Sequence, residues 1–370
     1  MKFEDLEISH FRGIDTARLE GIKQVNLITG RNNSGKTSIL EAMFVLSGMS
    51  NPRLLLNINA FRKLKFDNDN NLKYIFNNVE LNEPIKLQGT ISGIVRSATI
   101  TPHTEMMQDI LLKNKDLPHF FDQRAATNPS MQVTDLLQLE QSSLQNKIEE
   151  IDGINISFKN NSDKEQKVYI NFKDGRIKYS NTYKEKLSTK YLDSQITLTD
   201  VGSDLSLVVK KKQIKNIVDI LKRIEPHLLD IQIANDNSIY CDIGKDELLP
   251  INIMGDGIRH TLAVLSAMYD MQNGVIFIDE VENGLHYSSI KIFWQAVLRL
   301  ADELDVQIVA TTHSYEAVKA LKEASKMLPG KNPYKEIAFF RIEKEDSKTT
   351  VIHYDYETFI TSLDEGYEVR

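Results

Sequence analysis

The sequence contains a single cysteine, and this scarcity excludes two classes of site. With only Cys241 among its 370 residues, the chain can form neither an internal disulfide framework nor a metal site built from several cysteines. It also lacks an uninterrupted apolar run near the roughly 20 residues that a membrane-spanning helix needs. The start, Met1 to Asp5, is not a basic and then apolar secretory leader. We therefore expect a cytoplasmic protein with no membrane partner.

An excess of positive charge is also missing, which argues against indiscriminate binding of nucleic acid. The formal net charge is −7, with 45 Lys and Arg against 52 Asp and Glu. One local basic cluster runs from Lys210 to Arg223, on a stretch whose apolar residues repeat at helical spacing. A solvated helix face is the commoner explanation of such a pattern, and a DNA contact is the alternative.

Residues 30–37 match the pattern G-x-x-x-x-G-K-[ST] of a phosphate loop. The β-prone run 24–29 and the helical spacing of apolar residues over 37–46 supply the strand and the helix that such a loop joins. Its glycines let successive N–H groups point at phosphate oxygens, at the positive end of the helix. We expect Lys36 to reach the β- and γ-phosphates and Thr37 to offer its hydroxyl to Mg²⁺. The predicted nucleotide-binding residues of this loop are Gly30, Asn32, Asn33, Ser34, Gly35, Lys36, Thr37 and Ser38.

A second motif, over residues 274–280, is an apolar strand that ends in two acids, the form of a Walker B element. Such a strand brings Asp279 to the carboxyl edge of the sheet, where phosphates and Mg²⁺ gather. We predict that Asp279 is a metal-side ligand with Thr37, and that Glu280 is the general base for an attacking water. Paired acids alone more often cap a helix, but the phosphate loop in the same chain favours the catalytic interpretation.

The next predicted strand, 307–310, runs into Thr311-Thr312-His313-Ser314. His313 is therefore expected at the same sheet edge, one strand over, within reach of the γ-phosphate. A helix cap with an incidental imidazole is the alternative. The order of His313 after Asp279 and Glu280 favours a catalytic role.

The rest of the chain predicts an α/β protein. Two strands are expected within 6–20, on either side of a turn at Gly13, and two more within 85–100, on either side of Gly93. A helical pattern follows over 102–152, and a hairpin or small sheet is expected over 154–179. Strand and helix alternate from Ile251 onward, as in the second half of an α/β sheet. The predicted parts are 1–101, an N-terminal part of an ATPase core with the phosphate loop; 102–250, an inserted arm of helix and strand; and 251–370, the C-terminal part of the core.

Together these motifs resemble the ATPase head of the ABC-type superfamily that includes SMC proteins, RecF and the OLD-family ATPases. They are most similar to small bacterial ATPases termed AAA15 or AAA21, in which an opening like Ile8-Ser9-His10-Phe11-Arg12-Gly13 precedes such a loop. The resemblance implies an ABC-type P-loop ATPase head with a mixed sheet, flanking helices and an inserted arm. It implies ATP and Mg²⁺ as ligands, His313 as the switch histidine, and Glu282-Asn283-Gly284-Leu285-His286 at the place of the D-loop.

The resemblance also implies a signature turn that contacts the γ-phosphate bound to a partner subunit. The candidate is the stretch 253–259, with Gly255, Asp256 and Gly257 as the nucleotide contacts. The turn is degenerate, because Met254 stands where the ABC pattern places a serine. Arg12 is implied near the nucleotide, although an arginine after an aromatic residue in an edge strand is commonly a surface charge. Candidates for the glutamine that couples the γ-phosphate to movement of the arm are Gln88 and Gln108.

For function, the resemblance implies a homodimer or higher homo-oligomer in which two heads sandwich two ATP molecules. We expect hydrolysis to act as a switch for a separately encoded effector protein, such as a TOPRIM-type nuclease in anti-phage defence. One alternative is a RecF-like DNA-binding repair ATPase. The other is an ATP-bound oligomeric scaffold with negligible turnover.

Overall fold

The computed structural model describes residues 1–64, 71–103, 153–161, 163–171, 177–179, 183–194, 198–327, 336–345 and 348–366. Most of the predicted helical segment 102–152 lies outside these residues, as does Gln108. No helix in the ranges just given is both long and apolar enough to cross a membrane.

A mixed sheet forms the core, in the order β16-β15-β3-β14-β13-β9. Its strands are β3 (Val25–Gly30), β9 (Thr189–Leu192), β13 (Val275–Ile278), β14 (Gln307–Thr311), β15 (Ile337–Glu345) and β16 (Lys348–Tyr354). All neighbours run parallel except β15 and β16. Strands β3, β13 and β14 are buried at every residue, as expected for parallel strands covered on both faces. The phosphate loop therefore follows the strand next to β14, and β13 lies on the other side of β14.

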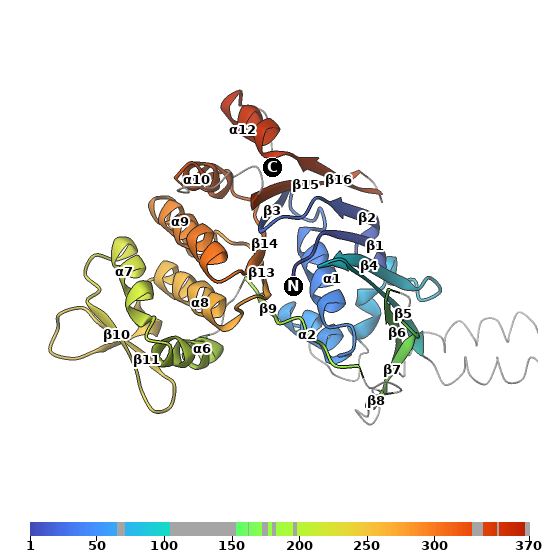
Figure 1. The fold of residues 1–370 in the computed structure, drawn as a ribbon, viewed down its shortest axis with the longest axis horizontal. Coiled ribbons are helices and arrows are strands. Elements are labelled where there is room, and N and C mark those ends of the chain that lie inside the picture. The colour runs from blue at the N-terminus through green and yellow to red at the C-terminus, as the bar shows by residue number, and fades with distance from the viewer. Residues whose placement is uncertain are drawn as a thin grey trace, which may run out of the picture.

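Helices cover both faces of the core sheet (Figure 1). On one face lie α8 (Asp256–Asp270), α9 (Tyr287–Glu303) and α10 (Tyr315–Ser325); α12 (Tyr356–Asp364) follows β16. On the other face, α1 (Lys36–Ser47) is buried at every residue from Ser38 onward. Its burial has a simple cause: α1 lies between the core sheet and a second sheet.

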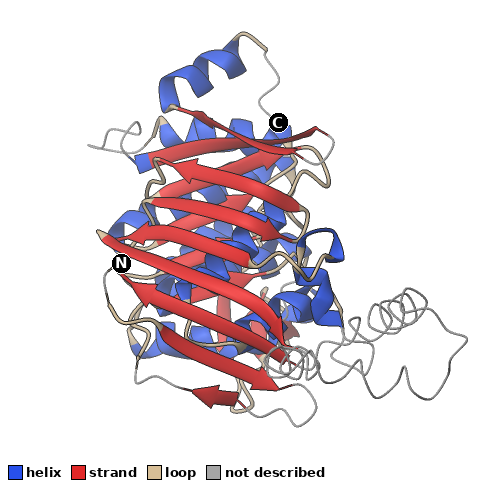
Figure 2. Cartoon of the chain, turned by 90° about the vertical axis from the view of Figure 1, so that its right-hand side faces the viewer, coloured by secondary structure: helices blue, strands red, loops and turns tan. Residues whose placement is uncertain are grey.

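The second sheet is antiparallel, in the order β2-β1-β4-β5-β6-β7-β8 (Figure 2). Its strands are β1 (Asp5–Phe11), β2 (Ile14–Glu20), β4 (Ile85–Ile91), β5 (Ile94–His103), β6 (Gly153–Asn160), β7 (Gln166–Asn171) and β8 (Ile177–Tyr179). The predicted hairpin around Gly93 joins β4 and β5. In the sequence between α1 and β4, the chain forms α2 (Arg53–Phe61) and the 3-10 turns η1 (Asn71–Ile75) and η2 (Asn77–Val79).

A separate lobe packs on α8, on the opposite side of the core from the antiparallel sheet (Figure 1). It contains α6 (Leu198–Lys210), α7 (Ile214–Ile224), β10 (Asp230–Ile233), β11 (Ile239–Asp242), β12 (Leu249–Pro250) and the 3-10 turn η3 (Ile251–Ile253). Helix α7 buries Ile217, Val218, Ile220 and Leu221, which leaves its basic side chains toward solvent.

The expected arm 102–250 is thus distributed over three places. Strand β6 pairs with β5 from Arg96↔Asn160 to His103↔Gly153, so β6 to β8 extend the N-terminal sheet. Strand β9 pairs with β13 in the core. Of the described residues, the segment from 198 onward forms the lobe. The three-part division at 101 and 250 stays a prediction.

Candidate nucleotide-binding and hydrolysis site

Two glycines give the phosphate loop its shape. Gly30 has φ +142°, and a Cβ there would lie 2.4 Å from the carbonyl oxygen of Ile342. Gly35 has φ +104° and precedes the first turn of α1, where no side chain caps the helix. Larger residues would strain the loop at both positions. The backbone N–H groups at the start of α1 are thereby left for an anionic ligand.

Lys36 folds back across the loop. Its Nζ donates to the carbonyl oxygens of Gly30 at 2.7 Å and Arg31 at 2.9 Å. Burial lowers the pKa of Lys36, and the negative charge of Asp279 opposes this shift. The hydroxyl of Ser34 is buried, and no described residue forms a hydrogen bond with it. An ammonium group held over the loop and an unused hydroxyl within it fit a bound phosphate chain.

A cavity of about 500 Å³ adjoins the loop. It is lined by Arg31, Asn32, Asn33, Ser34, Arg341, Ile342, Glu343, Lys344 and Glu345. Five of these nine residues come from the end of β15, the strand that pairs with β3 on the side away from β14. The loop therefore has polar space beside it.

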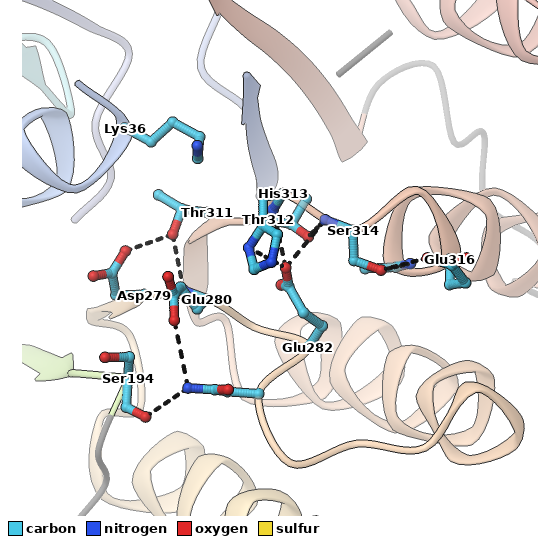
Figure 3. A network of polar contacts seen from close by, with 12 residues as sticks. Lys36, Ser194, Asp279, Glu280, Glu282, Thr311, Thr312, His313, Ser314 and Glu316 are labelled. Atoms are coloured by element: carbon cyan, nitrogen blue, oxygen red, sulfur yellow. Dashed lines mark hydrogen bonds and ion pairs between the residues drawn. The ribbon is translucent and has the colours of Figure 1, made fainter. Parts of the chain in front are cut away.

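The two predicted metal ligands lie side by side. Oγ1 of Thr37 is 3.1 Å from Oδ1 and 3.2 Å from Oδ2 of Asp279. Asp279 directly follows β13 and is buried, and it also accepts a hydrogen bond from the hydroxyl of Thr311 at 2.6 Å (Figure 3). One hydroxyl and one carboxylate beside a phosphate loop form the oxygen set that Mg²⁺ takes together with nucleotide phosphates.

Glu280 lies next to this pair in an unusual backbone conformation. Its φ is +52°, in the left-handed region that residues other than glycine seldom adopt. Its N–H donates to Oγ1 of Thr311 at 2.9 Å, and its carboxylate lies within 3.4 Å of Nδ2 of Asn283. Burial raises the pKa of Glu280, and the neighbouring charge of Asp279 raises it further. A carboxylate with a raised pKa suits a general base.

His313 lies one strand over and is half exposed. Its Nδ1 is 3.0 Å from Oε1 of Glu282, and the same oxygen accepts the backbone N–H groups of His313 at 2.9 Å and Ser314 at 3.1 Å. Figure 3 shows Lys36, Asp279, Glu280 and His313 at this one edge of the sheet. Sequence reasoning gave Glu282 no role of its own, because nothing in the pattern links it to a residue 31 positions later.

The signature-like turn begins α8 and packs on the D-loop stretch. A Cβ on Gly257 would lie 3.1 Å from the carbonyl oxygen of Gly284, and one on Gly284 would lie 2.7 Å from Cβ of Asp256. Asp256 forms an ion pair with Arg259. A Cβ on Gly255 would meet nothing within 4 Å. None of the described hydrogen bonds or ion pairs joins this turn to the phosphate loop of the same chain.

Arg12 is buried, so the interpretation as a surface charge is wrong. Its Nε lies 2.5 Å from Glu41, and its Nη2 donates to Oδ1 of Asn59 at 2.9 Å. Burial lowers the pKa of Arg12 to about 10. Glu41 also pairs with Arg62, whose Nη2 is 3.4 Å from Oγ of Ser38. The described polar contacts of Arg12 thus lie on α1, α2 and η1, and its role at the nucleotide stays a prediction.

Gln88 lies exposed in β4 of the antiparallel sheet, away from the edge that carries Asp279. The strand that ends beside Asp279 is β9, because the N–H of Asp279 donates to the carbonyl of Leu192 at 2.9 Å. The first glutamine after β9 in the sequence is Gln195, which lies outside the described residues.

Residues 1–216 match a family model described as "AAA ATPase domain", and residues 135–319 match one described as "AAA domain, putative AbiEii toxin, Type IV TA system". The first match alone covers more than half of the chain. The chain belongs to the AAA ATPase domain family. The chain is therefore an ATPase, as its motifs predicted, and it hydrolyses ATP.

This ATPase is 23% identical over 344 residues to an "ATP/GTP phosphatase" of Helicobacter pylori. The match covers 86% of this chain and 87% of that protein. A stretch of 42 residues is 55% identical to "DNA replication and repair protein RecF" of a Marinomonas species, 11% of each chain. The crystal structure of an SMC head bound to the C-winged helix domain of ScpA has a TM-score of 0.50 over 98% of this chain and all of that one, at 11% identity. That likeness shows the fold, an ABC-type P-loop ATPase head.

Proposed function

We propose that two copies of this ATPase close around two ATP molecules, and that hydrolysis separates them. Each ATP is held by the phosphate loop of one copy and by Gly255–Gly257 of the other. One observation carries the proposal: Lys36, Asp279, Glu280 and His313 meet at one sheet edge, while no described polar contact brings Gly255–Gly257 of the same chain to the phosphate loop. A second copy supplies the missing turn.

Within each site the residues take separate roles. Lys36 and the N–H groups at the start of α1 bind the phosphates. Thr37 and Asp279 would hold Mg²⁺, which would neutralise charge on the phosphates. Glu280 accepts a proton from the attacking water, and His313 contacts the γ-phosphate.

The surface around the signature-like turn favours a protein partner. Among the described residues, the two most exposed large apolar side chains are Tyr287, at 72%, and Ile253, at 65%. Tyr287 directly follows the D-loop stretch, and Ile253 lies two residues before Gly255. Exposed apolar side chains beside a predicted contact are what a second copy would cover.

The closed pair then acts as a switch for a separately encoded effector, such as a TOPRIM-type nuclease in anti-phage defence. Family resemblance supports this step, together with the toxin named in the description of the matched family model. The SMC head of the same fold was crystallised with a domain of a partner protein, which supports a head that binds an effector.

A RecF-like DNA-binding ATPase is the second candidate, favoured by the local RecF match and by a group of exposed lysines. Lys210, Lys211, Lys212 and Lys215 surround the turn between α6 and α7. This candidate predicts ATP-dependent DNA binding that weakens steeply with salt. Replacement of these four lysines by glutamine would abolish it. DNA binding that is absent or indifferent to salt removes the candidate.

The solution mass with and without Mg²⁺ and nucleotide tests the main proposal. Wild type and Glu280→Gln are compared with ATP and, because a relative is named an ATP/GTP phosphatase, with GTP. We expect Glu280→Gln to bind nucleotide, to hydrolyse it at least about 100-fold more slowly, and to accumulate as a dimer. Lys36→Ala, which removes the ammonium group, should stay monomeric. A mass that ignores nucleotide in all variants, with negligible turnover, favours the scaffold instead.

A further inference from the structure

Thr311, the last residue of β14, contacts the two acids that end the Walker B element and the residue that follows them. Its Oγ1 lies 2.6 Å from Oδ1 of Asp279 and 2.9 Å from the backbone nitrogen of Glu280. Its carbonyl oxygen accepts the N–H of Val281 at 3.0 Å. The side chain is fully buried, and Figure 3 shows its hydroxyl between the two acids.

The chemistry of the three groups fixes the direction of both hydrogen bonds. A backbone N–H can only donate, so the Thr311 oxygen accepts from Glu280. An ionised carboxylate can only accept, so the single hydroxyl proton points to Asp279. The hydroxyl therefore has one orientation, and both of its contacts are to acids of the proposed site.

Glu280 depends on such contacts to keep its backbone conformation. With φ at +52°, it lies in a region that a residue other than glycine occupies only when its surroundings hold it there. The bonds from Glu280 and Val281 to Thr311 are two of those constraints. Loss of the first frees the turn to relax and redirects the Glu280 carboxylate.

We infer that Thr311 is a positioning residue for hydrolysis. Its hydroxyl fixes the rotation of the Asp279 carboxylate beside Thr37 and the direction of the Glu280 carboxylate. This inference rests on the proposed roles of Asp279 and Glu280. The inference adds a residue to which the Walker B pattern gave no role. Thr311 belongs to a different strand, β14, which is separated from β13 by residues 279–306.

Three variants test the inference. Thr311→Val keeps the shape and removes the hydroxyl, whereas Thr311→Ser keeps the hydroxyl. Thr349→Val is the matched control, because Thr349 is a buried strand threonine of β16 whose hydroxyl has no hydrogen-bond partner among the described residues. All three are compared with wild type by thermal unfolding, so that folded protein is measured throughout.

Two readouts separate positioning from a general structural role. In nucleotide-free protein, hydrogen exchange at the Glu280 amide should be faster in Thr311→Val and unchanged in Thr311→Ser and Thr349→Val. With a fluorescent ATP analogue, Thr311→Val should need about 10-fold more Mg²⁺ for half-maximal binding and lose about 10- to 100-fold in kcat. Binding of the analogue without Mg²⁺ should be unchanged in all variants.

Wild-type exchange, Mg²⁺ dependence and kcat in Thr311→Val would overturn the inference. So would equal impairment of the Val and Ser variants, because the hydroxyl would then be irrelevant. Normal hydrolysis by Glu280→Gln instead overturns the proposed function, whatever the exchange rate at the Glu280 amide shows.

Discussion

A single oxygen of Glu282 holds His313 at two points. Oε1 of Glu282 accepts the backbone N–H of His313 at 2.9 Å and lies 3.0 Å from its Nδ1. Glu282 belongs to the D-loop stretch, which packs against the signature-like turn through Gly284. If a partner displaced that stretch, Glu282 would move and the imidazole of His313 would lose or follow its contact.

Removal of the Glu282 carboxylate should slow hydrolysis without weakening nucleotide binding. Charge-assisted hydrogen bonds of this kind contribute about 1.5–3 kcal/mol, so we expect Glu282→Ala to lower kcat by about 10- to 100-fold. Steady-state hydrolysis and equilibrium binding measure the two effects. Glu303→Ala, which breaks a surface ion pair with Arg299, is the control and should hydrolyse ATP normally. Equal rates in both variants would show that Glu282 does not position His313.

Gly284 should tolerate no side chain, for a reason that Gly93 does not share. Both have left-handed φ values, +71° and +74°, but a Cβ on Gly284 would lie 2.7 Å from Cβ of Asp256, whereas one on Gly93 meets nothing within 4 Å. We expect Gly93→Ala to cost about 1 kcal/mol in the free energy of unfolding. Gly284→Ala should cost more and should abolish the ATP-dependent rise in mass. Denaturant unfolding measures the stability and solution mass measures the ATP-dependent association. Similar behaviour of Gly284→Ala and Gly93→Ala would contradict contact between the D-loop stretch and the signature-like turn.

As the pH is lowered, the hydrolysis rate should begin to fall at a pH above the ordinary pKa range of a glutamate. Burial and the charge of Asp279 raise the pKa of Glu280, so this carboxylate keeps its proton to a higher pH than a free side chain. A general base works only when deprotonated, and the rate must therefore fall as pH drops through this raised value. Measurement of kcat/KM against pH, which reports the free enzyme, checks the direction, with nucleotide binding followed in parallel. An acid limb at or below the usual glutamate pKa would remove Glu280 as the base.

His260 on α8 should make the protein less stable in mild acid. Burial lowers its pKa from 6.5 to about 4, so between these values the unfolded chain binds a proton that the folded protein does not. The free energy of unfolding is then complete above pH 6.5 and falls by roughly 3 kcal/mol as pH drops to 4. His260→Leu should flatten this part of the stability curve, measured by urea unfolding. The exposed His227→Leu should leave the curve as in wild type, and an unchanged curve in His260→Leu would contradict the assignment.

The positions of the candidate phosphate and metal site were predictable because their chemistry lies in short contiguous motifs. The structure has β3 over Val25–Gly30 and α1 from Lys36, which is the strand, loop and helix that the glycine and lysine spacing predicted. Strand β13 over Val275–Ile278 likewise delivers Asp279 and Glu280 to the sheet edge. Continuous apolar runs that end in polar residues are a strong local signal for buried parallel strands.

Contacts between distant segments were not predictable in this way. Strand β9 is four residues long, so it carries too little pattern to reveal that it pairs with β13. Arg12 is a solitary charge in sequence, and only the packing of α1 places Glu41 beside it. The role of Thr311 is hidden for the same reason, because a threonine at the end of a strand is common and its two acidic neighbours come from another strand.

The order of strands around β3 has a consequence for synthesis of the protein. Strand β3 is translated early, but its two neighbours are β14 and β15, which end at Thr311 and Glu345. At about 5–20 residues per second, the ribosome needs roughly 15 to 60 seconds between completing β3 and completing β15. Until β15 is complete, at least one edge of the strand before the phosphate loop is unpaired. A nascent chain can therefore complete the surroundings of this strand only after β15 has been made.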